Sequence, residues 1–205
     1  MRLWQKFKIE MLKRTFDIFS SLIGLIILSP FLFIISILIL ITSRGGIFYH
    51  QVRVGKNGKD FHLWKFRTMK TDSDKPGLLT VGGRDARITG IGYFLRKYKI
   101  DELPQLINVL FGDMSLVGPR PEVRKYVNMY TPEQLHVLDV QPGITDYASI
   151  EYSNENDLLA KSSDPEKTYI DEVMPAKLKL NMKYIAEKSF GTDLKIIFRT
   201  IGKII

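Results

Sequence analysis

Residues 18–43 have the sequence IFSSLIGLIILSPFLFIISILILITS, a run of 26 residues without an ionisable side chain. Asp17 and Arg44 bound this run. A helix that crosses the hydrocarbon layer of a bilayer needs about 20 apolar residues. The run is too long for a typical signal peptide and too far from a small-residue cleavage site. It therefore predicts a membrane segment.

Two features predict that this segment enters and leaves the membrane on one side. Lys and Arg flank it at both ends, whereas a spanning helix carries them mainly on the cytoplasmic side. Pro30 lacks the N–H that would bond the Ile26 carbonyl, which the Ser29 hydroxyl could bond instead. We therefore expect a re-entrant helix-break-helix hairpin, broken at Ser29 and Pro30, with arms of about 18 Å. A kinked single-span anchor is the alternative.

The composition divides the chain into two parts. With 205 residues, 45% of them hydrophobic, the chain has enough apolar residues for one compact domain besides the membrane segment. We expect the membrane hairpin over residues 1–44 and a cytoplasmic domain over 45–205. The absence of cysteine excludes disulfide frameworks, thiolate metal sites and cysteine nucleophiles. The net charge of +8 predicts an anionic partner.

The second part is predicted to be mostly α with a small β-hairpin (α+β). Asn57-Gly58 is a strong hairpin-turn signal between two strand-like segments within residues 47–69. Residues 70–88 predict a loop. Pro165 marks a helix start, with Ser163 or Asp164 as its cap. The final helix combines an apolar stripe with basic residues, which suits a membrane interface or packing on the core. The predicted helices are 89–99, 101–112 with Gly112 at its end, 155–187 with a break near residue 164, and 192–205.

Two short motifs carry the chemistry. Asp101-Glu102-Leu103-Pro104-Gln105 opens with two acids and places Pro in what would be the first helical turn. Helix capping would explain one of these acids, because Asp is a favoured N-cap and acids suit the positive end of the helix dipole. In Gly118-Pro119-Arg120-Pro121, two prolines hold the backbone extended and fix the direction of the Arg120 guanidinium.

These motifs, with Ser29-Pro30, Lys65-Phe66-Arg67-Thr68-Met69 and Gly112-Asp113-Met114-Ser115, closely resemble the bacterial sugar transferase family. Its members are monotopic phosphoglycosyl transferases. The resemblance covers nearly the whole chain, which looks like the small form of the family. It implies transfer of a sugar-1-phosphate from a UDP-sugar to undecaprenyl phosphate, with Mg²⁺ and release of UMP, as the first membrane step of glycan assembly. It also supports the re-entrant hairpin.

The resemblance assigns residue roles. Asp101 matches the family's nucleophile and Glu102 its dyad partner; the pair is expected to hold Mg²⁺, although Glu102 could transfer a proton instead. At a helix N-terminus Asp101 is expected to stay ionised and to form an aspartyl-phosphosugar intermediate. Arg96 matches an arginine that holds a phosphate. The other matches expected to line the site are Lys65 and Arg67, for phosphate, and Arg120 and Glu122, for the nucleotide sugar.

The expected partners are a UDP-sugar, polyprenyl phosphate and membrane lipid at the cytoplasmic face of the bacterial inner membrane, with no nucleic acid; a homodimer is left open. The segment Asp146-Tyr147-Ala148-Ser149 departs from many relatives, which puts the sugar identity in doubt.

One alternative is a membrane-anchored, non-catalytic module that binds acidic lipid or glycan. It explains the charge but not the acid pair among arginines. A nucleic-acid binder is suggested by basic residues beside Trp64 and Phe66, but anionic lipid is the simpler partner next to a membrane segment.

Overall fold

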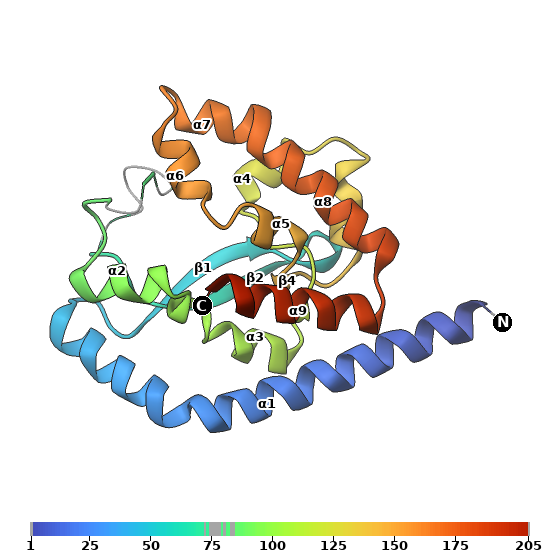
Figure 1. Cartoon of the computed structure of the whole chain (residues 1–205), viewed down its shortest axis with the longest axis horizontal. Helices are drawn as coiled ribbons and strands as arrows, with labels where there is room; N and C mark the ends of the chain where they lie inside the picture. The colour runs from blue at the N-terminus through green and yellow to red at the C-terminus, as the bar shows by residue number, and fades with distance from the viewer. Residues whose placement is uncertain (1, 72, 74–78, 80, 83–84, 205) are drawn as a thin grey trace.

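A long N-terminal helix and a body of short helices and two small sheets make up the fold (Figure 1). The computed structural model describes residues 2–71, 73, 79, 81–82 and 85–204. Helix α1 (Arg2–Thr42) runs along one side of the body, next to α3 (Gln105–Phe111). The mostly helical architecture with a small hairpin is the predicted α+β class. Nine of the 19 residues of the predicted loop over 70–88 lie outside the described residues.

The predicted hairpin is confirmed. Strand β1 (Phe48–Val54) pairs antiparallel with β2 (Asp60–Phe66), and Val54 lies opposite Asp60 at the turn. A short 3₁₀ turn, η1 (Lys56–Gly58), connects the two strands. Asn57 and Gly58 have φ angles of 57° and 72°. This left-handed backbone is the one that Asn and Gly adopt at least cost, which is why the pair signals a turn.

A second sheet was not predicted. Strands β3 (Ser115–Val117) and β4 (Gly143–Thr145) pair in parallel, although they are too short to show the alternation that identifies a strand. Their backbones approach closely just beyond β3, where Gly143 N donates to the Pro119 carbonyl at 3.0 Å. A Cβ on Gly143 would lie 2.7 Å from the Cα of Gly118. The contact fixes the start of the segment that carries Arg120.

Most remaining helices are short. The break predicted near residue 164 is confirmed, because the Asp164 side chain accepts from Lys167 N at 3.0 Å and Pro165 begins the next helix. The helices are α2 (Gly90–Lys97), α4 (Arg124–Val127), α5 (Tyr147–Glu151), α6 (Glu155–Ala160), α7 (Pro165–Thr168), α8 (Met174–Glu187) and α9 (Phe190–Ile204), with the 3₁₀ turns η2 (Ile100–Glu102) and η3 (Gln134–Asp139) and the π-helical η4 (Tyr169–Val173). Helices α6, α7 and α8 lie on the side of the sheets away from α1, whereas α2 lies beside α1 (Figure 1).

Both halves of α1 are attached to the same body. Near its start, Lys13 Nζ lies 2.5 Å from Asp193 Oδ2 of α9. Near its end, Ile35 and Ile39 are buried in a cluster that includes residues of β2 and α2. Between these attachments, most of the apolar side chains are exposed, among them Ile26, Ile27 and Phe33, as expected of a surface that meets lipid.

Helix α1 does not break at Pro30. It is one continuous helix through Pro30 that changes direction along its length (Figure 1), so the expected division into two separate helices is corrected to a bend. The Ser29 hydroxyl donates to the Ile26 carbonyl at 2.8 Å, which satisfies the acceptor that Pro30 leaves free. Within the described residues, only the part Glu10–Thr42 of this helix is long and apolar enough to cross a membrane.

Candidate active site

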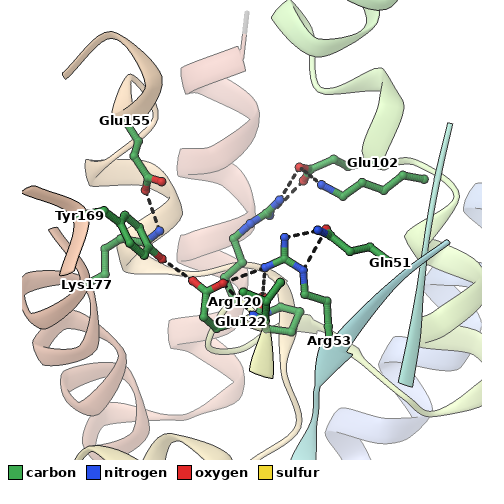
Figure 2. A network of polar contacts seen from close by, with 11 residues as sticks. Gln51, Arg53, Glu102, Arg120, Glu122, Glu155, Tyr169 and Lys177 are labelled. Carbon is green, nitrogen blue, oxygen red and sulfur yellow. Dashed lines mark hydrogen bonds and ion pairs between the residues drawn. The ribbon is translucent and has the colours of Figure 1, made fainter. Parts of the chain in front are cut away.

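Three distant parts of the chain meet at Glu102. Its carboxylate accepts from Lys65 Nζ of β2 at 3.2 Å and from both terminal nitrogens of Arg120, one of them at 3.0 Å (Figure 2). The side chains of Lys65 and Glu102 are largely buried, and that of Arg120 is about 29% exposed. The structure therefore brings together Glu102, Lys65 and Arg120 as predicted, with Asp101 beside Glu102 in η2.

Asn108, which sequence reasoning missed, holds η2 and α3 against β2. The Asn108 side chain lies in α3, where its Oδ1 accepts from Trp64 N at 2.9 Å and its Nδ2 donates to the His62 carbonyl at 2.8 Å. Both bonds go to the strand that carries Lys65. The turn into η2 passes through Lys99 with φ at 55°, a left-handed conformation that costs a non-glycine residue about 1–2 kcal/mol.

Asp146 holds the backbone at Arg120. One carboxylate oxygen of Asp146 accepts from Arg120 N at 3.1 Å, and the other accepts from Ser149 N at 2.6 Å as the N-cap of α5. Asp146 has no exposed surface. The Arg120 guanidinium also donates to the Ile144 carbonyl of β4 at 3.3 Å. Asp146 is therefore a positioning residue for Arg120.

The charges around Glu102 keep it ionised. Burial alone would raise the pKa of Glu102, but the positive charges of Arg120 and Lys65 outweigh burial and hold that pKa well below its usual range. Burial likewise lowers the pKa of Lys65, and the negative charge of Glu102 opposes this change. The negative charge of Glu102 raises the pKa of Arg120. The cluster is a buried ion network with two cations around one carboxylate.

Asp101 differs from Glu102 because neither Lys65 nor Arg120 forms an ion pair with it. The residue is 5% exposed, and its Oδ1 has no hydrogen-bond partner within the described part of the chain. Burial raises the pKa of Asp101, the charge of Glu102 raises it further, and Lys65 and Arg96 oppose these effects. The expected capping role is wrong, since Asp101 lies in η2 and Pro104 occupies the N-cap position of α3. The dipole of α3 therefore does not explain the ionisation of Asp101.

The other predicted residues lie around this cluster at different places. Arg96 lies in the last turn of α2, where its charge acts on Asp101. Glu122 belongs to an adjoining network, in which Arg53 Nη1 donates to Glu122 at 3.0 Å and the Tyr169 hydroxyl donates to its other oxygen (Figure 2).

Arg67 bonds to backbone carbonyls and not to Glu102. Its guanidinium donates to the carbonyls of Gly46 and Phe48 at 3.1 and 3.0 Å. These bonds support the connection between α1 and β1. They give no support to the expected phosphate-binding role of Arg67, which stays a prediction.

The predicted Mg²⁺ site fits Asp101 better than Glu102. The unpartnered buried oxygen of Asp101 suits a hard cation, whereas both oxygens of Glu102 are engaged by Lys65 and Arg120. Among the residues that the structure describes, no three His, Asp or Glu side chains are grouped so that they could hold a metal ion. A magnesium ion at Asp101 would therefore need oxygens from water or from a bound substrate.

Comparisons with known proteins identify the family of the chain. Residues 8–205 match the family described as "Bacterial sugar transferase". The chain is 36% identical over 197 residues to "UDP-N-acetylgalactosamine-undecaprenyl-phosphate N-acetylgalactosaminephosphotransferase" of Aeromonas hydrophila, covering 95% of this chain and 44% of the relative. It is 38% identical over 195 residues to "UDP-glucose:undecaprenyl-phosphate glucose-1-phosphate transferase" of Klebsiella pneumoniae, covering 93% and 39%. A relative of matching length is "Exopolysaccharide production protein PSS" of Rhizobium leguminosarum bv. phaseoli, 39% identical over 197 residues and 93% of both chains. The chain thus spans less than half of the first two relatives.

The positioning role of Asp146 predicts a larger stability loss than its cap alone would give. Asp146→Ala and Asp164→Ala each remove a helix N-cap, which costs about 0.5–2 kcal/mol. Only Asp146→Ala also leaves the Arg120 N–H without its acceptor, at a further cost of about 1–3 kcal/mol. Denaturant unfolding in detergent should therefore show the larger loss of unfolding free energy for Asp146→Ala. Equal losses would contradict the role.

Proposed function

The chain belongs to the bacterial sugar transferase family, and we propose that it is an enzyme that transfers a sugar-1-phosphate from a UDP-sugar to undecaprenyl phosphate, with release of UMP. The names of the Aeromonas and Klebsiella relatives support this reaction. The observation that carries the proposal is the buried, unpartnered carboxylate oxygen of Asp101, next in the chain to Glu102, which pairs with Lys65 and Arg120.

In the first step, an Asp101 oxygen attacks the phosphorus that bears the sugar. A new phosphorus–oxygen bond forms, and the bond from this phosphorus to the bridging oxygen breaks, so that UMP leaves with the electron pair. An aspartyl-phosphosugar remains. A diphosphate repels an incoming carboxylate, so the attack needs compensating positive charge. Lys65, Arg96 and Arg120 supply it around Asp101 and Glu102. When bound, Mg²⁺ would add neutralisation of the diphosphate charge.

In the second step, a phosphate oxygen of the polyprenyl phosphate attacks the same phosphorus. The bond to Asp101 breaks and the free carboxylate returns. Both attacks occur at phosphorus, so the bond between the anomeric carbon and its oxygen stays intact. The product therefore keeps the anomeric configuration of the donor.

The attachment of α1 supports a re-entrant topology in this reaction. Its first half is fixed to α9 by Lys13, and its second half is fixed to the body by Ile35 and Ile39. If α1 crossed the membrane as a straight helix, one of its halves would have to leave the body. Asp193 would then lose its ion pair with Lys13. We propose that the bend at Pro30 dips into the cytoplasmic leaflet of the bacterial inner membrane. This would hold Asp101 near the headgroups, where a soluble donor and a lipid acceptor can meet.

The covalent step predicts a product without acceptor lipid. Incubation with a UDP-sugar and Mg²⁺ alone should give a burst of UMP and a protein mass increased by one phosphosugar. Asp101→Asn should abolish both, because an amide is not a nucleophile at phosphorus, while Asp139→Asn at an exposed carboxylate should leave both unchanged. Mass spectrometry and UMP release measure the two products. An Asp101→Asn variant that still gives the adduct would contradict the proposal.

The topology predicts that both ends of α1 react from one side of the membrane. The chain contains no cysteine, so single Gln5→Cys and Arg44→Cys variants give an unambiguous signal. A membrane-impermeant maleimide should label both variants in inside-out vesicles and neither in right-side-out vesicles. Labelling of the two positions from opposite sides would establish a spanning helix instead.

A further inference from the structure

A cavity lies on the other side of Arg120 from Glu102. Its volume is about 160 Å³. Arg53, Arg120 and Glu122 border it on one side, and Glu155 of α6 and Lys177 and Asn181 of α8 border it on the other. Figure 2 shows Arg120 reaching from this region toward Glu102, with Lys177 and Glu155 facing each other nearby. One guanidinium thus connects the cavity to the catalytic carboxylates.

Asn181 gives the cavity an acceptor that nothing in the described chain satisfies. Asn181 is 5% exposed, and its Oδ1 has no hydrogen-bond partner. A buried acceptor left unpaired costs about 1–3 kcal/mol. Asn181 and Lys177 lie four residues apart on α8 and therefore on one face of that helix. Because Asn181 borders the cavity, a donor group bound there could supply the missing partner.

Each cation that borders the cavity is already paired, Arg53 and Lys177 with carboxylates of the cavity and Arg120 with Glu102 beyond it. Lys177 Nζ lies 2.6 Å from Glu155, and Arg53 lies 3.0 Å from Glu122. A phosphate would meet two carboxylates here and no uncompensated cation. Hydroxyl groups both donate and accept, so a ring with several hydroxyls can bond to the carboxylates and to the cations together.

The size of the cavity also restricts its ligand. Pockets for drug-sized ligands have volumes of roughly 300–1,000 Å³. A cavity of about 160 Å³ is small for a complete nucleotide sugar and suits a single ring.

We propose that this cavity holds the hexose ring of the donor, with Asn181 Oδ1 accepting from a hydroxyl or an acetamido N–H of that ring. The inference rests on the proposed function and extends it, because it names residues that bind the sugar ring. With the sugar-bearing phosphate between Arg120 and Asp101, the ring attached to it points into the cavity and the nucleotide lies outside.

Binding measurements with and without the sugar test this assignment. The Asp101→Asn background prevents adduct formation, and the full chain in nanodiscs is titrated calorimetrically with UDP, UDP-glucose and UDP-N-acetylgalactosamine. Adding Asn181→Leu should weaken the better-bound UDP-sugar about tenfold, the equivalent of about 1.4 kcal/mol, and leave the affinity for UDP unchanged. The matched control is Lys179→Leu, which places a leucine at an exposed position of α8. This variant should change the affinity for neither UDP nor the UDP-sugar.

Two outcomes would overturn the assignment. A parallel loss of UDP affinity would place the nucleotide in the cavity, and no loss for any ligand would mean that the cavity holds only water. If Asn181→Leu does not fold, Asn181→Ser withdraws the acceptor without adding bulk and should give the same selective loss. UMP release by the unmodified chain distinguishes the two proposals. An active enzyme with an unaffected Asn181 variant refutes only the sugar assignment, whereas an inactive enzyme refutes the proposed function and the assignment with it.

Discussion

The buried ion network of Glu102 with Lys65 and Arg120 is the interaction on which the site depends. It joins β2, η2 and the segment after β3, which are distant in the chain. Removing one partner of a buried ion pair costs about 3–5 kcal/mol, because the other charge stays buried and uncompensated. The network also has a chemical consequence. Glu102 engages both cations, so Asp101 beside it keeps a free oxygen, and two adjacent acids acquire different roles.

In the proposed topology, helix α1 connects this network to the membrane. Its Lys13 pairs with Asp193, and its Ile35 and Ile39 pack on the other end of the body, so the exposed apolar bend between them has a fixed position relative to Asp101. The helix also continues through Pro30 without a break. Ser29 satisfies the carbonyl that Pro30 leaves free.

Local sequence signals predicted the features whose physical causes are local. Asn57-Gly58 turns the hairpin, Gly112 ends α3 with φ at 96°, and Pro165 begins α7 because each of these residues determines its own backbone. The parallel pair β3–β4 was missed because each strand has only three residues. Asn108 and Asp146 were missed as positioning residues because they bond to groups 46 and 26 residues away in the chain. The site residues themselves came from motifs, but only the fold shows which of them meet.

The central claim is that Glu102 forms the ion pairs with Lys65 and Arg120, so that Asp101 stays buried without an ion-pair partner. A ¹³C NMR titration of the Asp side-chain carboxyl groups, with Asp101→Asn used to assign the signal, tests it most directly. The account predicts that Asp101 titrates above 3.8, the usual value for Asp, because burial and the charge of Glu102 both disfavour its ionised form. A pKa below 3.8 would show that Asp101 holds a cation itself, and would contradict the division of roles between the two acids.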